Sequence, residues 1–242
     1  MHMSYPFHDD ILLRGNAEAL EYLYLCVDDD AIATLGQMQA FEGSHRVLRY
    51  VYINWPSFNR NVTSESDDDT YRFLNRLVNV VEKLIALSMR EAWGCIAAAQ
   101  HGQGFQNIKE FSLDTGTMSL FEMLSVLKAF PGLVKLTNTI NGLGLELEDI
   151  AADALPDYVV SAFGNVGKHL QVWSMPFVSG YMGVKMLDYV ALLMLVCPDL
   201  CRVHMNGGSG EGVRAKIAEV QGSQRFSKYR SRLDKLLEVV RE

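Results

Sequence analysis

The sequence has no long hydrophobic run and no signal-like start. Its longest uninterrupted apolar stretch, at positions 190–197, is far shorter than the roughly 20 residues that a membrane-spanning helix needs. Positions 1–14 are polar and contain no apolar segment of signal-peptide length. We therefore expect no membrane span and no membrane partner, and we predict a cytoplasmic or nuclear protein.

Cysteine and basic charge are also scarce. The four cysteines in 242 residues are too few for a disulfide framework, and most fall where small buried apolar residues belong, which suits a reducing compartment. A formal net charge of −7 argues against a nucleic-acid backbone as the main partner. Hydrophobic residues make up 49% of the chain and charged residues 21%, so the composition is that of a globular protein.

A segment that ends a helix and begins a strand occurs twice. Residues 130–136 read Phe-Pro-Gly-Leu-Val-Lys-Leu, and residues 197–203 read Cys-Pro-Asp-Leu-Cys-Arg-Val. Apolar runs typical of helices precede them, at 119–129 and 184–196. The proline ends each helix because it disfavours the helical conformation of the preceding residue. The pattern that follows, apolar-x-x-apolar-x-apolar, predicts a short strand.

The same strand pattern occurs seven times along the chain. The occurrences begin at Leu20, Leu48, Val81, Ile108, Leu133, Leu170 and Leu200. Between them, residues 31–41, 70–80, 92–100 and 155–163 predict helices, the last with a proline in its first turn. A strand and a helix repeated in this way bury their apolar face only by stacking on neighbouring repeats. We therefore expect an α/β solenoid, with parallel strands on the concave side and helices on the convex side.

The C-terminal part has a different pattern. Positions 206–212 are rich in glycine and predict a flexible link. From Phe226 onward, apolar residues recur on one face of a charged helix, which would cap the last repeat. We expect two regions: a solenoid over residues 1–206, and a link with a C-terminal capping helix over residues 207–242. No equivalent cap is expected before Leu20.

The repeated segment resembles a known signature. Residues 197–203, with valine at the last position, resemble the Cys-Pro-x-Leu-x-x-Leu motif of the irregular leucine-rich repeats in F-box proteins, and residues 130–136 match with Phe in place of Cys. The overall sequence pattern of the chain is similar to that of the divergent F-box/leucine-rich-repeat families of fungi. This resemblance implies a horseshoe whose inner sheet captures a substrate protein for a ubiquitin ligase. We expect no F-box before Leu20, so a ligase adaptor is implied as a partner only if an F-box lies outside this chain.

The side chains between the buried positions of each strand are expected to lie on the opposite face, because side chains alternate along a strand. On the first two strands these include tyrosines, which form an aromatic patch typical of binding hot spots. The candidate partner-binding residues are Tyr22, Tyr24, Tyr50, Tyr52, Trp55, Lys83, Glu110, Lys135, Arg202 and His204. Two structural explanations stay open: cross-strand tyrosines stabilise a sheet, and the alternating charges pair with one another.

We expect a non-enzymatic protein-interaction module that binds a protein on its concave face and needs no cofactor or metal ion. One alternative is a structural protein that self-associates through its N-terminal repeat. The other is an enzyme that uses Ser174, Arg202 and His204 on neighbouring strands. Each explanation depends on the same predicted sheet.

Two further segments have the chemistry of a site without its spacing. Residues 164–169 contain two glycines and a lysine but lack the spacing and the hydroxyl residue of a phosphate loop. Cys197, Cys201 and His204 include thiols and an imidazole, but the repeat signature already accounts for Cys197. Neither segment predicts a function.

Overall fold

The computed structural model describes residues 2–4, 21–26, 50–54, 86–89, 108–175, 180–205 and 210–241. The chain divides into two compact units, Met1–Gly116 and Thr117–Glu242. Strands in both units pair in parallel. The predicted class, an α/β protein with a parallel sheet, is therefore confirmed. The helices expected at 31–41, 70–80 and 92–100 lie outside the described residues.

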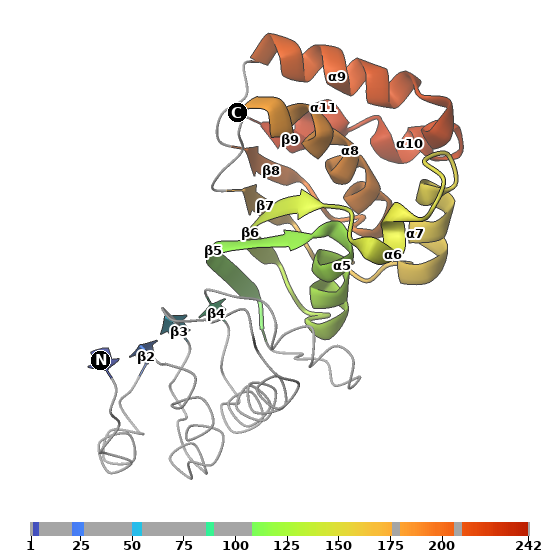
Figure 1. The fold of residues 1–242 in the computed structure, drawn as a ribbon. Helices are drawn as coiled ribbons and strands as arrows, with labels where there is room; N and C mark the ends of the chain where they lie inside the picture. Colours follow the sequence, from blue (N-terminus) through green and yellow to red (C-terminus); the bar gives the residue numbers. More distant parts are fainter. Residues whose placement is uncertain are drawn as a thin grey trace. The chain divides into compact units, whose positions relative to one another are not determined.

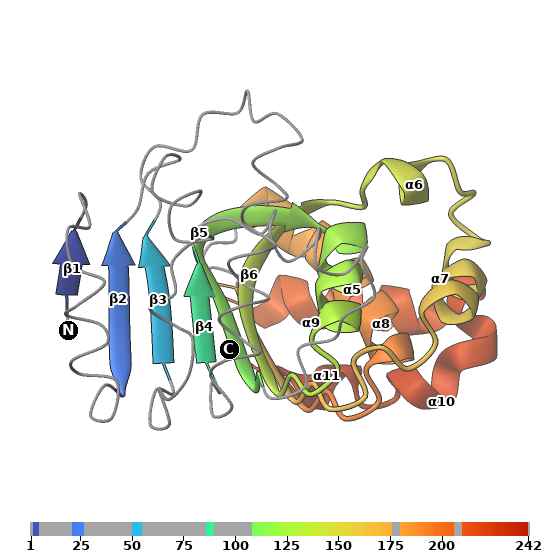
Figure 2. The ribbon, with the colours of Figure 1, turned by 90° about the horizontal axis from the view of Figure 1, so that it is seen from below.

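Strands of the first unit follow one another in chain order (Figure 2). They are β1 (His2–Ser4), β2 (Tyr22–Cys26), β3 (Tyr50–Asn54), β4 (Ala86–Met89) and the beginning of β5 (Glu110–Ser119). The register pairs Tyr22 with Tyr50, and Ala86 with both Tyr50 and Glu110. Because paired strands lie about 4.8 Å apart, these four positions form one row. The sequence pattern did not predict β1.

The predicted register of the third strand pattern is wrong. A pattern that begins at Val81 places Lys83 in the exposed row, but the observed strand starts at Ala86, which occupies that row beside Tyr50. The pattern that matches begins at Leu84, three residues later. A shift by an odd number of residues exchanges the two faces of a strand. Lys83 is therefore not part of β4, and it lies outside the described residues.

The second unit combines four strands with the described helices. Its strands are β6 (Lys135–Gly142), β7 (Val172–Met175), β8 (Arg202–Met205) and β9 (Val240–Arg241). Its helices are α5 (Leu120–Ala129), α6 (Leu145–Glu148), α7 (Leu155–Phe163), α8 (Gly180–Val196), α9 (Gly210–Gly222), the 3-10 helix η2 (Gln224–Tyr229), α10 (Arg230–Leu233) and α11 (Leu236–Val239). Figure 1 shows α5, α7 and α8 on one side of β6–β8.

Helix α5 begins and ends where its sequence predicts. The backbone N–H of Glu122 donates to Ser119 Oγ at 3.2 Å, and the backbone N–H of Ser119 donates to Glu122 Oε2 at 2.6 Å. This capping box satisfies two N–H groups that a helix start leaves unpaired. The helix ends at Ala129, just before Phe130 and Pro131. The helix predicted at 119–129 is thus confirmed.

The two later helices are confirmed in the same way. Helix α7 has the predicted bounds and carries Pro156 in its first turn. Helix α8 begins at Gly180, four residues earlier than the pattern indicated, and ends at Val196, before Pro198. All side chains from Val190 to Cys197 are buried, because α8 packs against α7, α9 and α10. A helix enclosed in this way loses its amphipathic pattern.

The side chains that point into the core of the second unit are those the pattern predicts. Leu133, Leu136, Trp173, Leu200 and Val203 are all buried. Asn138 takes the third apolar position of its pattern and is also buried. Its Oδ1 accepts a hydrogen bond of 2.9 Å from the indole Nε1 of Trp173 on the next strand. The amide thus satisfies a donor that would otherwise be buried without a partner.

The single amphipathic helix predicted from Phe226 onward is wrong. The segment forms η2, α10 and α11, and then β9, which pairs in parallel with β8. Phe226, Leu233 and Leu236 are buried as predicted, whereas Leu237 is 52% exposed. Helix α9 covers Gly210–Gly222, so the flexible link predicted over 206–212 is wrong for residues 210–212. The C-terminal segment adds a strand to the sheet as well as helices.

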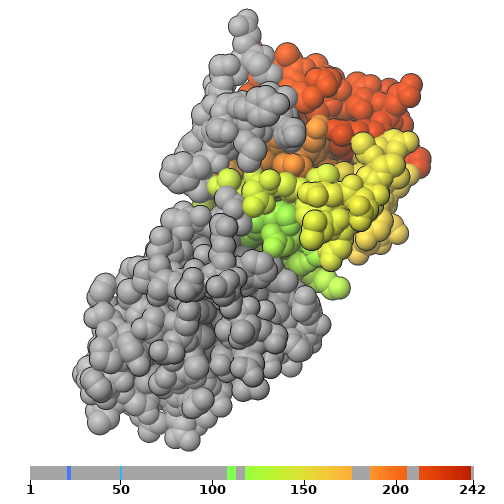
Figure 3. Space-filling view, viewed as in Figure 1, coloured from blue at the N-terminus to red at the C-terminus, as the bar shows by residue number. Residues whose placement is uncertain are grey.

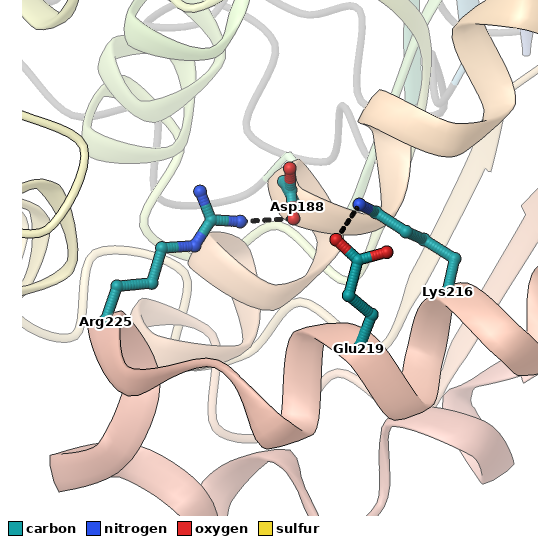
Figure 4. Close-up of polar contacts among 4 residues, drawn as sticks. All are labelled: Asp188, Lys216, Glu219 and Arg225. Carbon is teal, nitrogen blue, oxygen red and sulfur yellow. Dashed lines mark hydrogen bonds and ion pairs between the residues drawn. The ribbon is translucent and has the colours of Figure 1, made fainter.

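Polar contacts attach this C-terminal segment to α7 and α8. Arg225 forms an ion pair with Asp188 of α8, beside the pair of Lys216 and Glu219 on α9 (Figure 4). Arg232 Nη1 donates to the carbonyl of Leu195 at 2.6 Å, where the last carbonyls of α8 have no helical partner. These contacts hold α8 against the C-terminal segment.

A second set of contacts joins the C-terminal segment to α7. The space-filling view shows that the surfaces of these two segments adjoin (Figure 3). Lys228 donates to Asp157, and Tyr229 Oη donates to the other oxygen of Asp157 at 2.7 Å. The hydrogen bonds from Lys228 and Tyr229 lower the pKa of Asp157 below its usual value. Asp157 also lies in the first turn of α7, where a carboxylate interacts favourably with the helix dipole.

Candidate functional site

An aromatic pair marks the first unit. The rings of Tyr22 and Tyr50 stack with their centroids 4.5 Å apart and an interplanar angle of 8°. Tyr22 is 57% exposed. The pair forms because the two residues are register partners on β2 and β3. Stacking of this kind stabilises neighbouring strands, and the exposed ring face is also suited to bind a partner. Both explanations offered by the sequence are therefore compatible with this geometry.

The second unit has an exposed strand face, which we call the polar face. It consists of Lys135, Thr137, Thr139, Val172, Ser174, Arg202 and His204. Each of these residues alternates with a buried neighbour on its strand. Because β6, β7 and β8 are in register, their residues form rows across the sheet. The alternation predicted from the sequence is confirmed on these three strands.

Two rows make up most of the polar face. The first pairs Lys135 with Val172, and Val172 with Arg202. The second pairs Thr137 with Ser174, and Ser174 with His204. The side chains of Lys135, Arg202 and His204 are exposed. Those of Arg202 and His204 form no hydrogen bond or ion pair within the part of the chain that the structure describes. The face thus presents cationic and hydroxyl groups to solvent.

Strand β9 extends the second row. Its register pairs the position of His204 with that of Arg241. The sequence did not predict this residue, because a two-residue strand has no detectable periodicity. A basic residue directly after the apolar Val240 was the only local signal.

The enzyme alternative requires Ser174 and His204 to act together, and the structure brings them close without a hydrogen bond between them. Ser174 and His204 are register partners on neighbouring strands, so their Cα atoms lie about 4.8 Å apart. No hydrogen bond joins their side chains in the described structure, and β6, β7 and β8 contain no Asp or Glu. A nucleophile needs a base within hydrogen-bond reach and a third group that orients this base. The polar face does not supply that third group.

The remaining motif-like segments have structural explanations. Gly164 ends α7 with a φ of 52°, a conformation that favours glycine. Gly167 donates its N–H to the carbonyl of Val196 at 3.3 Å and lies against the Sγ of Cys197. Burial raises the pKa of the Cys197 thiol, whereas Cys201 is exposed. Among the described residues, no group of three or more His, Cys, Asp or Glu could hold a metal ion.

The structure places the other candidate residues as follows. Tyr24 and Tyr52 are register partners on β2 and β3, but their side chains lie outside the described residues. Trp55 lies outside them entirely. Glu110 is exposed on β5, where it pairs with Ala86. The predicted alternation of charge among Lys83, Glu110 and Lys135 is wrong at Lys83, because Ala86 occupies that position in the row.

Comparison with other proteins adds no identification. No family model and no curated protein matches the chain. Within the described residues, no helix is both long and apolar enough to cross a membrane. The chemistry of the stacked tyrosines and of the polar face is therefore the basis for a functional proposal.

Proposed function

We propose that the chain is a protein-binding module built from stacked leucine-rich repeats. The observation that carries this proposal is the polar face: β6, β7 and β8 bury one set of alternating side chains and present the other to solvent. A parallel sheet with both faces covered would read as continuous apolar strands. Strands with one polar face are suited to bind a partner across their exposed side chains.

The stacked tyrosines support a protein partner. Tyrosine provides a large, rigid contact area with few rotatable bonds, and it is enriched at binding hot spots. The ring of the exposed Tyr22 stacks on that of Tyr50, so two such rings lie side by side. From the resemblance to F-box repeat proteins, we further propose that the module recognises the substrate of a ubiquitin ligase. It binds and performs no chemistry of its own.

Affinity capture tests this function. The full chain, its Tyr22→Ser/Tyr50→Ser variant and a Tyr158→Ser control are used as baits in extract of the source cell, with captured proteins identified by mass spectrometry. Tyr158 is an exposed tyrosine on α7, so the control removes a similar ring from another surface. We expect proteins that the wild type and the control retain and the double variant loses. Equal capture by all three baits would exclude the tyrosine pair as the contact.

Self-association is the second candidate function, and strand β1 favours it. Among the described strands, β1 pairs with β2 alone. An edge strand with unpaired backbone groups is a template for pairing with another chain. Sedimentation velocity over a hundredfold range of concentration tests this: a larger species that grows with concentration supports pairing, and a constant monomer excludes it.

A further inference from the structure

Charge is unevenly distributed in this chain. Residues 117–242 contain as many Lys and Arg as Asp and Glu, so with histidine neutral the whole net charge of −7 comes from residues 1–116. Within the second unit, the ionisable residues on the strands are all basic. They are Lys135 on β6, Arg202 and His204 on β8, and Arg241 on β9. The strands of this unit therefore carry basic residues and no acidic ones, although most of its lysines and arginines lie on other elements.

Spacing on the polar face matches that of an extended chain. Arg202 and His204 are two residues apart on β8, which is about 6.6 Å, and alternate side chains of any extended peptide have the same separation. Lys135 lies two strands from Arg202 in the same row, about 10 Å away. That distance runs across the strands, so Lys135 lies to one side of a segment that follows β8.

Hydroxyl groups lie in the row next to that of Lys135 and Arg202. Thr137 and Ser174 share the row that leads to His204, and both are partly exposed. Hydroxyls donate to carboxylate oxygens, and guanidinium groups bind carboxylates through two parallel hydrogen bonds. No carboxylate on β6–β9 competes for these donors. The polar face is therefore complementary to an anionic segment.

We propose that the polar face binds an acidic, extended segment of a partner protein, with carboxylates at alternate positions opposite Arg202 and His204. This inference rests on the proposed protein-binding function and names the chemistry of the partner. The overall charge of −7 disfavours non-specific attraction of an acidic peptide. Binding would therefore require the local field of Lys135 and Arg202 beside the imidazole of His204.

Fluorescence anisotropy with the full chain tests the proposal. The probe is a fluorescein-labelled peptide of alternating Glu and Thr, and a Gln–Thr peptide is its neutral counterpart. We expect the Glu–Thr peptide to bind and the Gln–Thr peptide to bind at least tenfold more weakly. Raising the salt concentration from 50 to 500 mM should weaken the Glu–Thr complex, because salt screens exposed charges. Equal affinity for both peptides would overturn the proposal.

Matched variants locate the site. Arg202→Glu should weaken Glu–Thr binding at least tenfold, and Arg202→Gln by a smaller factor. Arg230→Glu makes the same charge change at another exposed arginine, in α10, and should change affinity less than twofold. An equal loss in Arg202→Glu and Arg230→Glu would mean that net charge alone decides binding, which overturns the assignment. Thermal unfolding of each variant confirms that it is folded.

Two further outcomes separate this inference from the proposed function. A phosphoserine–threonine peptide that binds while the Glu–Thr peptide does not would overturn the carboxylate chemistry. If Arg202→Glu leaves both the peptide affinity and the capture of extract proteins unchanged, the acidic-segment inference fails and the protein-binding function stands. If the peptide binds through Arg202 and no extract protein is captured, the proposed function fails on its own.

Discussion

Replacement of Gly167 by alanine is the sharpest test of how the second unit packs. A Cβ at this position would overlap the Sγ of Cys197 and lie 3.2 Å from Leu127 Cδ1. Cys197 is 1% exposed and Leu127 is fully buried, so neither neighbour has solvent to move into. The φ of Gly167 lies outside the left-handed region, so the backbone itself accepts alanine. The overlap alone decides the outcome.

The expected cost follows from over-packing. An extra methyl group in a closely packed core costs roughly 1–3 kcal/mol. For a chain of this size, a loss of about 2 kcal/mol lowers the midpoint of thermal unfolding by roughly 4–8 °C. Cys197→Ala removes the overlapping sulfur and leaves a small cavity, at a cost of about 1 kcal/mol. In the double variant the new methyl group occupies that space, so the two effects should not add.

Urea unfolding followed by tryptophan fluorescence measures the four corners of this cycle. We expect Gly167→Ala/Cys197→Ala to be more stable than the sum of its single variants by about 1–2 kcal/mol. Gly222→Ala is the control, because a Cβ there meets no atom within 4 Å, and its stability should stay within about 1 kcal/mol of the wild type. A stable Gly167→Ala, or strict additivity, would refute the packing of residue 167 against Cys197.

Three other predictions address single interactions. Ser119→Ala removes the capping box of α5 and should cost about 1 kcal/mol in urea unfolding, whereas Ser125→Ala, which removes a hydroxyl bonded within the same helix, should be nearly neutral; equal losses would contradict the capping role. Asn138→Leu leaves the buried indole N–H of Trp173 unpaired and should cost roughly 1–3 kcal/mol; adding Trp173→Phe should recover part of this loss, and no recovery would contradict the hydrogen bond as its cause. Asp157→Asn should lower the thermal midpoint at pH 7. The folded-state pKa of Asp157 is lowered from 3.8, so the stabilisation by its carboxylate is present above pH 3.8 and is lost as the pH falls through the folded-state pKa. A difference from the wild type that persists at pH 2 would contradict the ion pair as its source.

Much of the polar face could be predicted from the sequence. Lys135, Arg202 and His204 each alternate with apolar residues, and alternation with a period of two assigns a side chain to one face without reference to the rest of the fold. Pro131 and Pro198 mark the helix ends just before two of these strands. Such signals are local, because they depend only on backbone geometry and on the apolar character of a few neighbouring residues.

The register of β4 could not be predicted in the same way. Patterns that begin at Val81 and at Leu84 both place apolar residues at the required spacing, and only pairing with β3 and β5 selects the second. Strands β1 and β9 are too short to show a period, and they form through their partners β2 and β8. The register position of Arg241 beside His204 could therefore not be predicted from its own surroundings.

Sequence by itself thus determined that β6, β7 and β8 alternate with α5, α7 and α8, where these three helices end, and how buried and exposed side chains alternate on the strands. Tertiary structure alone decided which strand pattern pairs, that Asn138 serves the indole of Trp173, and that the C-terminal segment binds Asp157 and Asp188. The physical reason is the range of the forces. Periodicity and capping act within one or two turns of chain, whereas register, buried hydrogen bonds and ion pairs depend on residues that only folding brings together.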